Sequence, residues 1–272
     1  MTKRILTVQD LSCVGQCSLT VALPILSAIG VETAVLPTSI LSNHTMFAGW
    51  TKLDLDDEID KIFVEWSKHK FTFDSLYTGY VGNSYLVNKI NEVKNKITDG
   101  KVIVDPAMAD HGKLYPGFDG EYVQAMSNLC QGAYAILPNL SEASLLLGIE
   151  YKEFTKQECE EIIKKLHEKF NSSVILKGVQ ENGKLGVMVL DKDTGKIECY
   201  LHKKISTNYH GTGDIFASVF VGMFVNGYSL LKSAKGAADF VVKCILNTIF
   251  DKEHFYGVHF EPLLKTLGKY VK

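Results

Sequence analysis

The chain has 272 residues, of which 29 are Lys or Arg and 31 are Asp or Glu, so its formal net charge is −2. Apolar residues make up 46 % and charged residues 22 %, an ordinary globular composition that argues against disorder, collagen-like repeats and coiled coil. A balance so close to neutral also argues against a nucleic-acid-binding protein.

The cysteines and the apolar stretches predict a reduced cytoplasmic protein with no membrane partner. No two of the six cysteines are separated by two residues, the spacing that zinc sites favour, so we expect small core residues instead. Residues 1–10 lack the apolar core of a signal peptide, and the strongly apolar stretch 215–225 is too short to span a bilayer as a helix.

Strand-like and helix-like segments alternate along the chain. The expected strands cover residues 5–8, 31–36 (stopping at Pro37), 75–78, 102–104, 133–137, 174–176, 185–190 and 196–201. The expected helices cover residues 17–29 (kinked at Pro24 or starting later), 56–68, 85–97, 121–129, 141–147, 156–170, 212–225 and 230–250.

This alternation predicts an α/β fold in which a mostly parallel central sheet carries helices on both faces. Residues 1–272 contain no linker rich in Pro, Gly or Ser, so we expect a single domain. Substrates of such folds bind at the carboxyl ends of the strands. The polar segment 38–54, between the second strand and its helix, is the best candidate for a small flap.

The strongest chemical signal is the segment His210–Ala217, where two glycines and a threonine lead into a long apolar helix. Free N–H groups at such a helix N-terminus, together with the helix dipole, form an anion site. Asp214 falls in the first turn, where a carboxylate can accept a proton from a hydroxyl that attacks a phosphoryl group. The alternative is an ordinary acidic residue in a first helical turn.

A second glycine-containing segment, Gly178–Lys184, matches only the beginning of a P-loop. Leu185 follows where a P-loop has Ser or Thr, and the next element is a strand, so no helix dipole is available. We therefore interpret residues 181–183 as a tight turn, and residues 191–195 as a second one.

Carboxylates follow two expected strands beside prolines. Asp105 precedes Pro106, and Glu142 comes shortly after Pro138-Asn139. The ends of neighbouring parallel strands meet in space, and carboxylate oxygens near a triphosphate suit Mg²⁺, so Asp105 and Glu142 are candidate metal ligands. Glu142 alone could equally be a surface residue in a first helical turn.

Together these segments resemble the pyridoxal kinases of the ribokinase superfamily, over about residues 4 to 250. The matching segments are Ser42–Thr45, Thr78–Gly82, Asp105-Pro106, Pro138-Asn139 with Glu142, and Gly211–Asp214; Gln9–Gly15 is similar to the bacterial enzymes often called pyridoxamine kinases. The resemblance implies a ribokinase-like three-layer sandwich, ATP with Mg²⁺ and a homodimer, and it leaves a monovalent cation open.

The resemblance also implies a role for each matching residue. Asp214 corresponds to the catalytic base, and Gly211, Thr212 and Gly213 correspond to the anion hole for the γ-phosphate. Asp105, Asp110 and Glu142 correspond to acidic positions near Mg-ATP, and Lys177 to a residue that contacts ATP phosphates, unless it is a solvated strand end. Thr45 and Tyr80 correspond to contacts with the pyridine ring; for His44 we favour a buried, hydrogen-bonded residue.

Asp10 stands where many pyridoxal kinases have Ser, and Met46-Phe47 and Ala109 also depart from the family pattern. We hypothesise that Asp10 contacts the polar edge of the ring or the ammonium of pyridoxamine. The expected reaction is transfer of the γ-phosphoryl group of ATP to the 5′-hydroxymethyl group of a vitamin B6 vitamer.

Three other functions remain open. A hydroxymethylpyrimidine kinase of thiamine synthesis usually has Cys where this chain has Asp214, and a sugar or nucleoside kinase lacks the segment Ser42–Thr45. A non-catalytic vitamer- or nucleotide-binding protein would not need the intact set of acidic and glycine residues.

Overall fold

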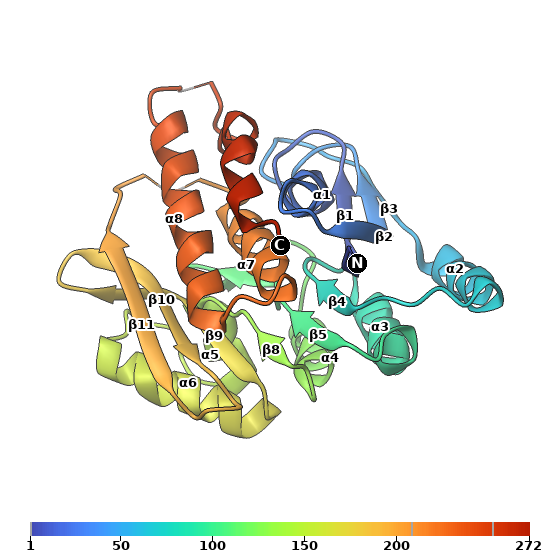
Figure 1. Ribbon diagram of the computed structural model, residues 1–272, viewed down its shortest axis with the longest axis horizontal. Coiled ribbons are helices and arrows are strands. Elements are labelled where there is room, and N and C mark those ends of the chain that lie inside the picture. Colours follow the sequence, from blue (N-terminus) through green and yellow to red (C-terminus); the bar gives the residue numbers. More distant parts are fainter. Residues whose placement is uncertain (1, 208, 252) are drawn as a thin grey trace.

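The structure is a computed structural model that describes residues 2–207, 209–251 and 253–272. Its nine-stranded sheet has the order β11-β10-β9-β8-β5-β4-β1-β2-β3 (Figure 1). The strands are β1 (Arg4–Ser12), β2 (Glu32–Leu41), β3 (Lys52–Asp54), β4 (Ser75–Thr78), β5 (Lys101–Val104), β8 (Ala135–Ile136), β9 (Ser173–Glu181), β10 (Lys184–Leu190) and β11 (Ile197–Lys203). The six strands from β9 to β2 in this order pair in parallel, and β3, β10 and β11 pair antiparallel, which confirms the mostly parallel sheet.

Helices cover both faces of the sheet (Figure 1). One face carries α1 (Leu19–Ala28), α7 (Thr212–Val225), α8 (Leu230–Thr248) and the 3₁₀ segment η1 (Glu261–Tyr270). The other carries α2 (Asp56–His69), α3 (Ser84–Ile97), α4 (Gly120–Cys130), α5 (Leu140–Leu147) and α6 (Lys156–Phe170). Side chains of a strand alternate between the two faces of the sheet, and both faces are covered. In β1, Ile5 packs in one apolar cluster and the next residue, Leu6, packs in the other.

The strand order contains a switch point between β1 and β4. The chain passes from β1 to β2 on one side and later returns to place β4 on the other side of β1, so the connections diverge between β1 and β4. Such a switch point leaves a crevice at the carboxyl ends of the strands, which is where α/β proteins bind ligands. Residues that follow β1, β4, β5 and β8 are therefore brought to one edge.

Four features of the fold differ from the sequence-based expectations. β2 does not stop at Pro37 but continues to Leu41. Proline has no N–H to donate, and β2 tolerates it because β3 pairs only with Ser39–Leu41, so Pro37 has β1 alone as a neighbour, beside a register shift between Gln9 and Leu11. The first helix agrees with one of its two alternatives, because α1 begins at Leu19, later than its apolar pattern, and contains Pro24. The pattern also missed β3, the short hairpin β6 (Ala109–Asp110) and β7 (Lys113–Leu114), and η1.

Both expected tight turns are present. Asn182 and Gly183 have φ of 49° and 71° between the antiparallel strands β9 and β10, so the P-loop-like segment is a hairpin, as predicted. The second turn joins β10 to β11, where Gly195 has a φ of 69°. Within the described ranges, none of the helices is both long and apolar enough to cross a membrane.

Candidate active site

A cavity of about 330 Å³ lies at the carboxyl edge of the sheet, against the N-terminus of α7. This volume suits a small ring-shaped ligand. Nine of the residues that the sequence singled out line it: Asp10, Thr45, Tyr80, Asp105, Glu142, Lys177, Gly211, Gly213 and Asp214. Residues 10 and 214 are far apart in the chain, so the parallel topology, and not local sequence, brings these groups together.

The loop before α7 can adopt its turn only with glycine at position 211. Gly211 has a φ of 74°, and a Cβ atom there would lie 1.8 Å from the carbonyl oxygen of Gln16. A Cβ atom at Gly213 would meet nothing within 4 Å, although this residue lines the cavity. The backbone N–H groups at this helix start are therefore accessible to an anion in the cavity.

Asp214 carries a carboxyl group whose proton affinity suits a base. The pKa of Asp214 is raised to about 7, mainly by burial and also by the charges of Asp105 and Asp10. The backbone N–H of Ser18 lowers it in part. A general base works best when its pKa is close to the working pH. The side chain is thus poised to accept a proton from a hydroxyl group in the cavity.

Lys177, in the middle of β9, forms an ion pair with Asp105, which directly follows β5. The Nζ atom of Lys177 donates to both carboxylate oxygens of Asp105, at 2.9 and 3.0 Å. Only 15 % of the Lys177 side chain and 4 % of the Asp105 side chain is exposed, so Lys177 is not a solvated strand end. Burial opposes the charge of Lys177, but Asp105 and Glu142 outweigh it, and the pKa of Lys177 is raised.

Glu142 is both a structural cap and part of the cavity wall. Its Oε2 accepts from the backbone N–H of Asn139 at 2.7 Å, which completes a capping box at the start of α5. Its Oε1 accepts from the N–H of Met108 at 3.3 Å. Burial raises the pKa of Glu142 to about 8, with Lys177 opposing and Asp105 adding to the shift. Glu142 is buried and is not the surface residue of the alternative interpretation.

The donor set on this wall fits a magnesium ion. Asp105 and Glu142 both line the cavity, and each of their carboxylate oxygens accepts one hydrogen bond in the protein and keeps a further lone pair. Mg²⁺ usually retains several waters and takes one or two carboxylates, directly or through those waters. Asp105 and Glu142 therefore suit it chemically.

Asp10, Tyr80 and Thr45 also line the cavity. Asp10 is almost fully buried at the end of β1, and its Oδ2 accepts from the hydroxyl of Ser12 at 3.1 Å. Burial raises the pKa of Asp10, while the hydroxyls of Ser18 and Ser12 lower it. The ring of Tyr80 stacks on Phe118 with a centroid separation of 5.1 Å, and Phe118 stacks on Tyr122. This stack holds an aromatic face in the cavity wall.

The loop between β2 and β3 forms part of the cavity wall. It contributes His44, Thr45 and Met46, and β2 and β3 pair antiparallel at its base. His44 is hydrogen-bonded, as favoured, because its Nδ1 accepts from the N–H of Met46 at 3.1 Å. The ring centroids of His44 and His210 are 5.4 Å apart. Burial, and to a smaller extent the charge of His210, lowers the pKa of His44 to about 4.

Two sequence-predicted residues lie apart from the cavity wall. Asp110 lies in the β6–β7 hairpin with 58 % of its side chain exposed, and it accepts from the N–H of His111 at 2.9 Å. Thr212 turns its hydroxyl back to the carbonyl of Tyr209, at 3.1 Å. A nucleotide role for Asp110 and a side-chain role for Thr212 stay predictions.

Ser18 and Tyr115 also line the cavity, although neither was predicted from the sequence. Ser18 has a φ of 48° and a ψ of −126°, a conformation that costs a non-glycine residue energy and is common at functional sites. Its hydroxyl faces Asp10 and its backbone N–H faces Asp214. Tyr115 reaches the cavity from the β6–β7 hairpin. No local pattern marks either residue, because backbone strain and hairpin placement are tertiary properties.

Comparisons with known proteins agree with this geometry. The model of the phosphomethylpyrimidine kinase family matches residues 25–259. A Bacteroides thetaiotaomicron protein with a provisional phosphomethylpyrimidine kinase name, crystallised with pyridoxal, is 35 % identical and superposes with a TM-score of 0.93 over 98 % of this chain and 96 % of its own.

Two further relatives carry the name pyridoxal kinase. The structure of pyridoxal kinase from Lactobacillus plantarum is 32 % identical, with a TM-score of 0.91 over 98 % of this chain and 97 % of its own. Pyridoxal kinase PdxY of Pasteurella multocida is 25 % identical over 88 % of this chain and 87 % of its own. The expected ribokinase-like fold is thus confirmed, and the chain belongs to the phosphomethylpyrimidine kinase family, among relatives that are pyridoxal kinases.

Proposed function

We propose that this protein is an ATP-dependent pyridoxal kinase, which transfers the γ-phosphoryl group of ATP to the 5′-hydroxymethyl group of a vitamin B6 vitamer. The observation that carries the proposal is the half-buried carboxyl group of Asp214 in the cavity wall, beside the open N-terminus of α7, with a pKa raised to about 7. The names of the similar proteins support the same reaction and the same salvage role.

In this mechanism Asp214 orients the 5′-hydroxyl group and accepts its proton as the oxygen attacks the γ-phosphorus. The N–H groups of the loop from Gly211 to Gly213 donate to the phosphoryl oxygens on which negative charge develops. Phosphoryl transfer needs little covalent help from the protein, so these groups act mainly by position and charge.

Lys177 is proposed to hold the phosphate chain of the nucleotide. Its Nζ has two hydrogen bonds to Asp105 and a third proton free to donate towards a phosphate oxygen. Asp105 and Glu142 are the residues that would hold Mg²⁺, which supplies charge neutralisation to a bound triphosphate. Because Asp105 keeps Lys177 charged and in place, it also acts as a positioning residue.

Asp10, Thr45 and Tyr80 are proposed to bind the vitamer. Tyr80 lines the cavity, and an aromatic ring there suits a flat pyridine ring. An ionised Asp10 facing the cavity would attract an ammonium group, which pyridoxamine has and pyridoxal lacks. The loop 42–51 would close over the ring and limit hydrolysis of ATP by water.

A hydroxymethylpyrimidine kinase is the second candidate, because the matching family model bears the phosphomethylpyrimidine kinase name. Both acceptors are flat heteroaromatic rings with a hydroxymethyl group. A coupled assay of ADP formation with pyridoxal, pyridoxamine, pyridoxine and hydroxymethylpyrimidine separates the candidates. Turnover with the pyrimidine alone would overturn the B6 assignment, and vitamer binding without ADP formation would indicate a carrier.

The role of Asp214 is tested by Asp214→Asn, with Glu168→Gln as a control at an exposed position of α6. A general base contributes roughly 10²–10⁴-fold, so kcat should fall by at least that order while ATP binding is retained. An ionised carboxylate with a raised pKa costs stability, so the asparagine variant should be at least as stable as the wild type at pH 8. Near-normal turnover would refute the assignment.

A homodimer and a cytoplasmic location are the remaining parts of the proposal. The cytoplasmic assignment is supported by all six cysteines being free thiols, as a reducing compartment requires. The homodimer is supported by the family resemblance, and sedimentation at micromolar concentration tests it.

A further inference from the structure

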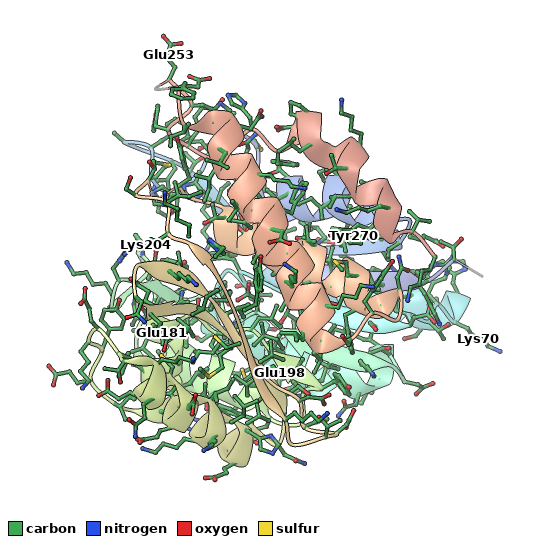
Figure 2. The ribbon with its side chains drawn as sticks, turned by 60° about the vertical axis from the view of Figure 1, so that its left-hand side comes forward. Lys70, Glu181, Glu198, Lys204, Glu253 and Tyr270 are labelled. Atoms are coloured by element: carbon green, nitrogen blue, oxygen red, sulfur yellow. The ribbon has the colours of Figure 1, made fainter. Side chains whose placement is uncertain are left out.

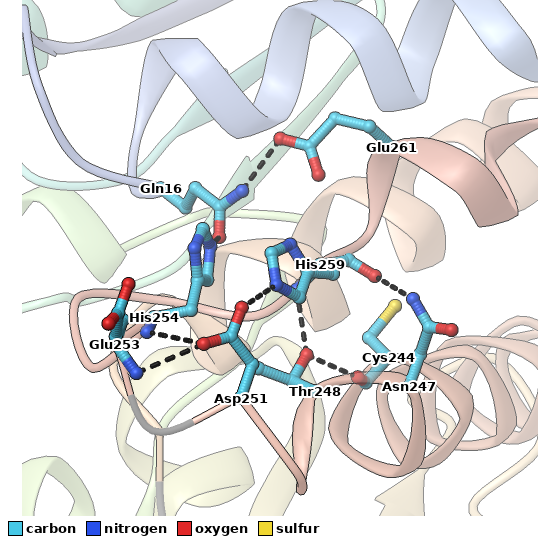
Figure 3. A network of polar contacts seen from close by, with 9 residues as sticks. All are labelled: Gln16, Cys244, Asn247, Thr248, Asp251, Glu253, His254, His259 and Glu261. Carbon is cyan, nitrogen blue, oxygen red and sulfur yellow. Dashed lines mark hydrogen bonds and ion pairs between the residues drawn. The ribbon is translucent and has the colours of Figure 1, made fainter.

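A cluster of one carboxylate and two imidazoles lies outside the cavity, in the loop between α8 and η1. Asp251, His254 and His259 each offer one ligand atom, and these atoms lie within 4.8 Å of one another (Figure 3). Figure 2 shows the neighbouring Glu253 pointing outwards at the edge of the molecule, so the loop is accessible to ions from solution. Neither the proposed reaction nor the cavity uses these residues.

The cluster is held in place by hydrogen bonds of its own. Asp251 Oδ2 lies 2.8 Å from His259 Nε2, and Asp251 Oδ1 accepts from the backbone N–H groups of Glu253 and His254 at 3.0 and 3.2 Å. The N–H of His259 donates to the hydroxyl of Thr248 at 2.8 Å. These contacts fix the backbone on both sides of the cluster before any ion binds.

Gln16 determines which nitrogen of His254 is free (Figure 3). The amide nitrogen of Gln16 donates to Glu261 at 2.6 Å, so its carbonyl oxygen must accept from His254 Nε2, 2.9 Å away. In a neutral imidazole the lone pair is then on Nδ1. An imidazole oriented by a hydrogen bond through its other nitrogen is the usual arrangement of a metal-binding histidine.

We propose that Asp251, His254 and His259 form a binding site for a divalent transition-metal ion of the Zn²⁺ class. Two imidazoles and a carboxylate favour such ions over Mg²⁺ or Ca²⁺, which prefer oxygen ligands alone. Bonds of about 2.0–2.2 Å place tetrahedral ligand atoms about 3.4 Å apart, so the side chains must close by roughly 1 Å. The two rings stack with centroids 3.8 Å apart, so a small turn of the His259 ring away from Asp251 brings its nitrogen to an ion shared with His254, which keeps its hydrogen bond to Gln16.

Aromatic contacts connect this site to the loop between β2 and β3, which forms part of the cavity wall. Phe255 and Tyr256 lie between the ligands, and their rings contact Phe47 with centroid separations of 5.4 and 5.7 Å. Phe47 follows Met46, which lines the cavity, in this loop. An ion that fixes residues 253–260 therefore also restrains the loop 42–51.

The test compares zinc binding by the wild type, His254→Gln/His259→Gln and Asp251→Asn. The matched control is His69→Gln/His202→Gln, which removes two exposed or half-exposed histidines from other elements. After treatment with a chelator, each full-length protein is titrated with ZnCl₂ by calorimetry and with CoCl₂ by visible absorption. The wild type and the control should bind one equivalent that the ligand variants lose or bind at least about 100-fold more weakly.

Hydrogen exchange with and without ZnCl₂ tests the effect on the wall. Zinc should protect residues 253–260 and 42–51 in the wild type and the control, and neither segment in the double ligand variant. Equal stoichiometry and affinity in His254→Gln/His259→Gln would overturn the site. Protection of residues 253–260 without protection of 42–51 would overturn the coupling to the cavity wall. Neither readout depends on the reaction assigned above.

Discussion

Alanine substitution of the two glycines before and within the first turn of α7 should separate stability from phosphoryl binding. Gly213 has open space at the Cβ position and lines the cavity, so Gly213→Ala should fold normally. Replacing glycine by alanine in a helix stabilises it by up to about 1 kcal/mol, which raises Tm by no more than about 3 °C in a chain of this size. The new methyl group should nevertheless occupy space that the phosphoryl group needs.

Gly211→Ala should damage both properties. The φ of 74° costs alanine about 1 kcal/mol, and a Cβ atom 1.8 Å from the carbonyl oxygen of Gln16 forces the loop to move by more than 1 Å. Overpacking of this kind costs about 1–3 kcal/mol, so we expect a total loss of about 2–4 kcal/mol.

Urea denaturation measures the stability of both variants, and initial rates at varied ATP measure kcat/KM. A displacement of about 1 Å in a reacting group costs about 10²-fold in rate, so both variants should lose activity to that extent. Wild-type kcat/KM for ATP in Gly213→Ala would show that the amides of this loop do not approach the phosphoryl group. Wild-type stability in Gly211→Ala would contradict the steric argument.

Three further predictions concern charge in the cavity. Because burial and the charges of Asp105 and Asp10 raise the pKa of Asp214 to about 7, and because the base must be ionised, kcat/KM should fall tenfold per unit as the pH drops below about 7. Asp105→Asn should move this acidic limb to lower pH in a pH–rate profile; an unmoved limb would assign it to another group. Lys177→Met should cost about 3–5 kcal/mol in urea denaturation, because it leaves a buried carboxylate unpaired, and Lys177→Met/Asp105→Asn should recover most of this loss. Asp10→Ser should lower the ratio of kcat/KM for pyridoxamine to that for pyridoxal, and an unchanged ratio would remove Asp10 from vitamer recognition.

Elements with strong local signals could be predicted from the sequence to within a residue or two. The predicted bounds of α6 and α7 agree with the structure, because α6 has a capping box and a regular apolar face and α7 follows a glycine loop. β3 and the β6–β7 hairpin could not be found, since strands of two or three residues have no period of their own. β2 passes through Pro37 because of its neighbours in the sheet, which the local pattern does not contain.

The candidate site follows the same division. The residue types in or just after β1, β5 and β9 and at the start of α7 were visible in the sequence, and all of Asp10, Asp105, Lys177 and Asp214 line one cavity. The pairing of Lys177 with Asp105, 72 residues apart, depends on the strand order, which places β5 and β9 on either side of β8. Ser18 and the Asp251 cluster were not anticipated at all, because both depend on backbone conformation and on contacts between distant segments.

The sequence alone determined the fold class and the chemical groups available to this protein, because periodic burial and glycine turns are local requirements of the backbone. Only the tertiary structure decided the state of those groups. Burial and the neighbouring carboxylates set the pKa of Asp214 at about 7, and the parallel order of the strands makes Asp105 the partner of Lys177. Both effects act across space between segments that the sequence keeps apart.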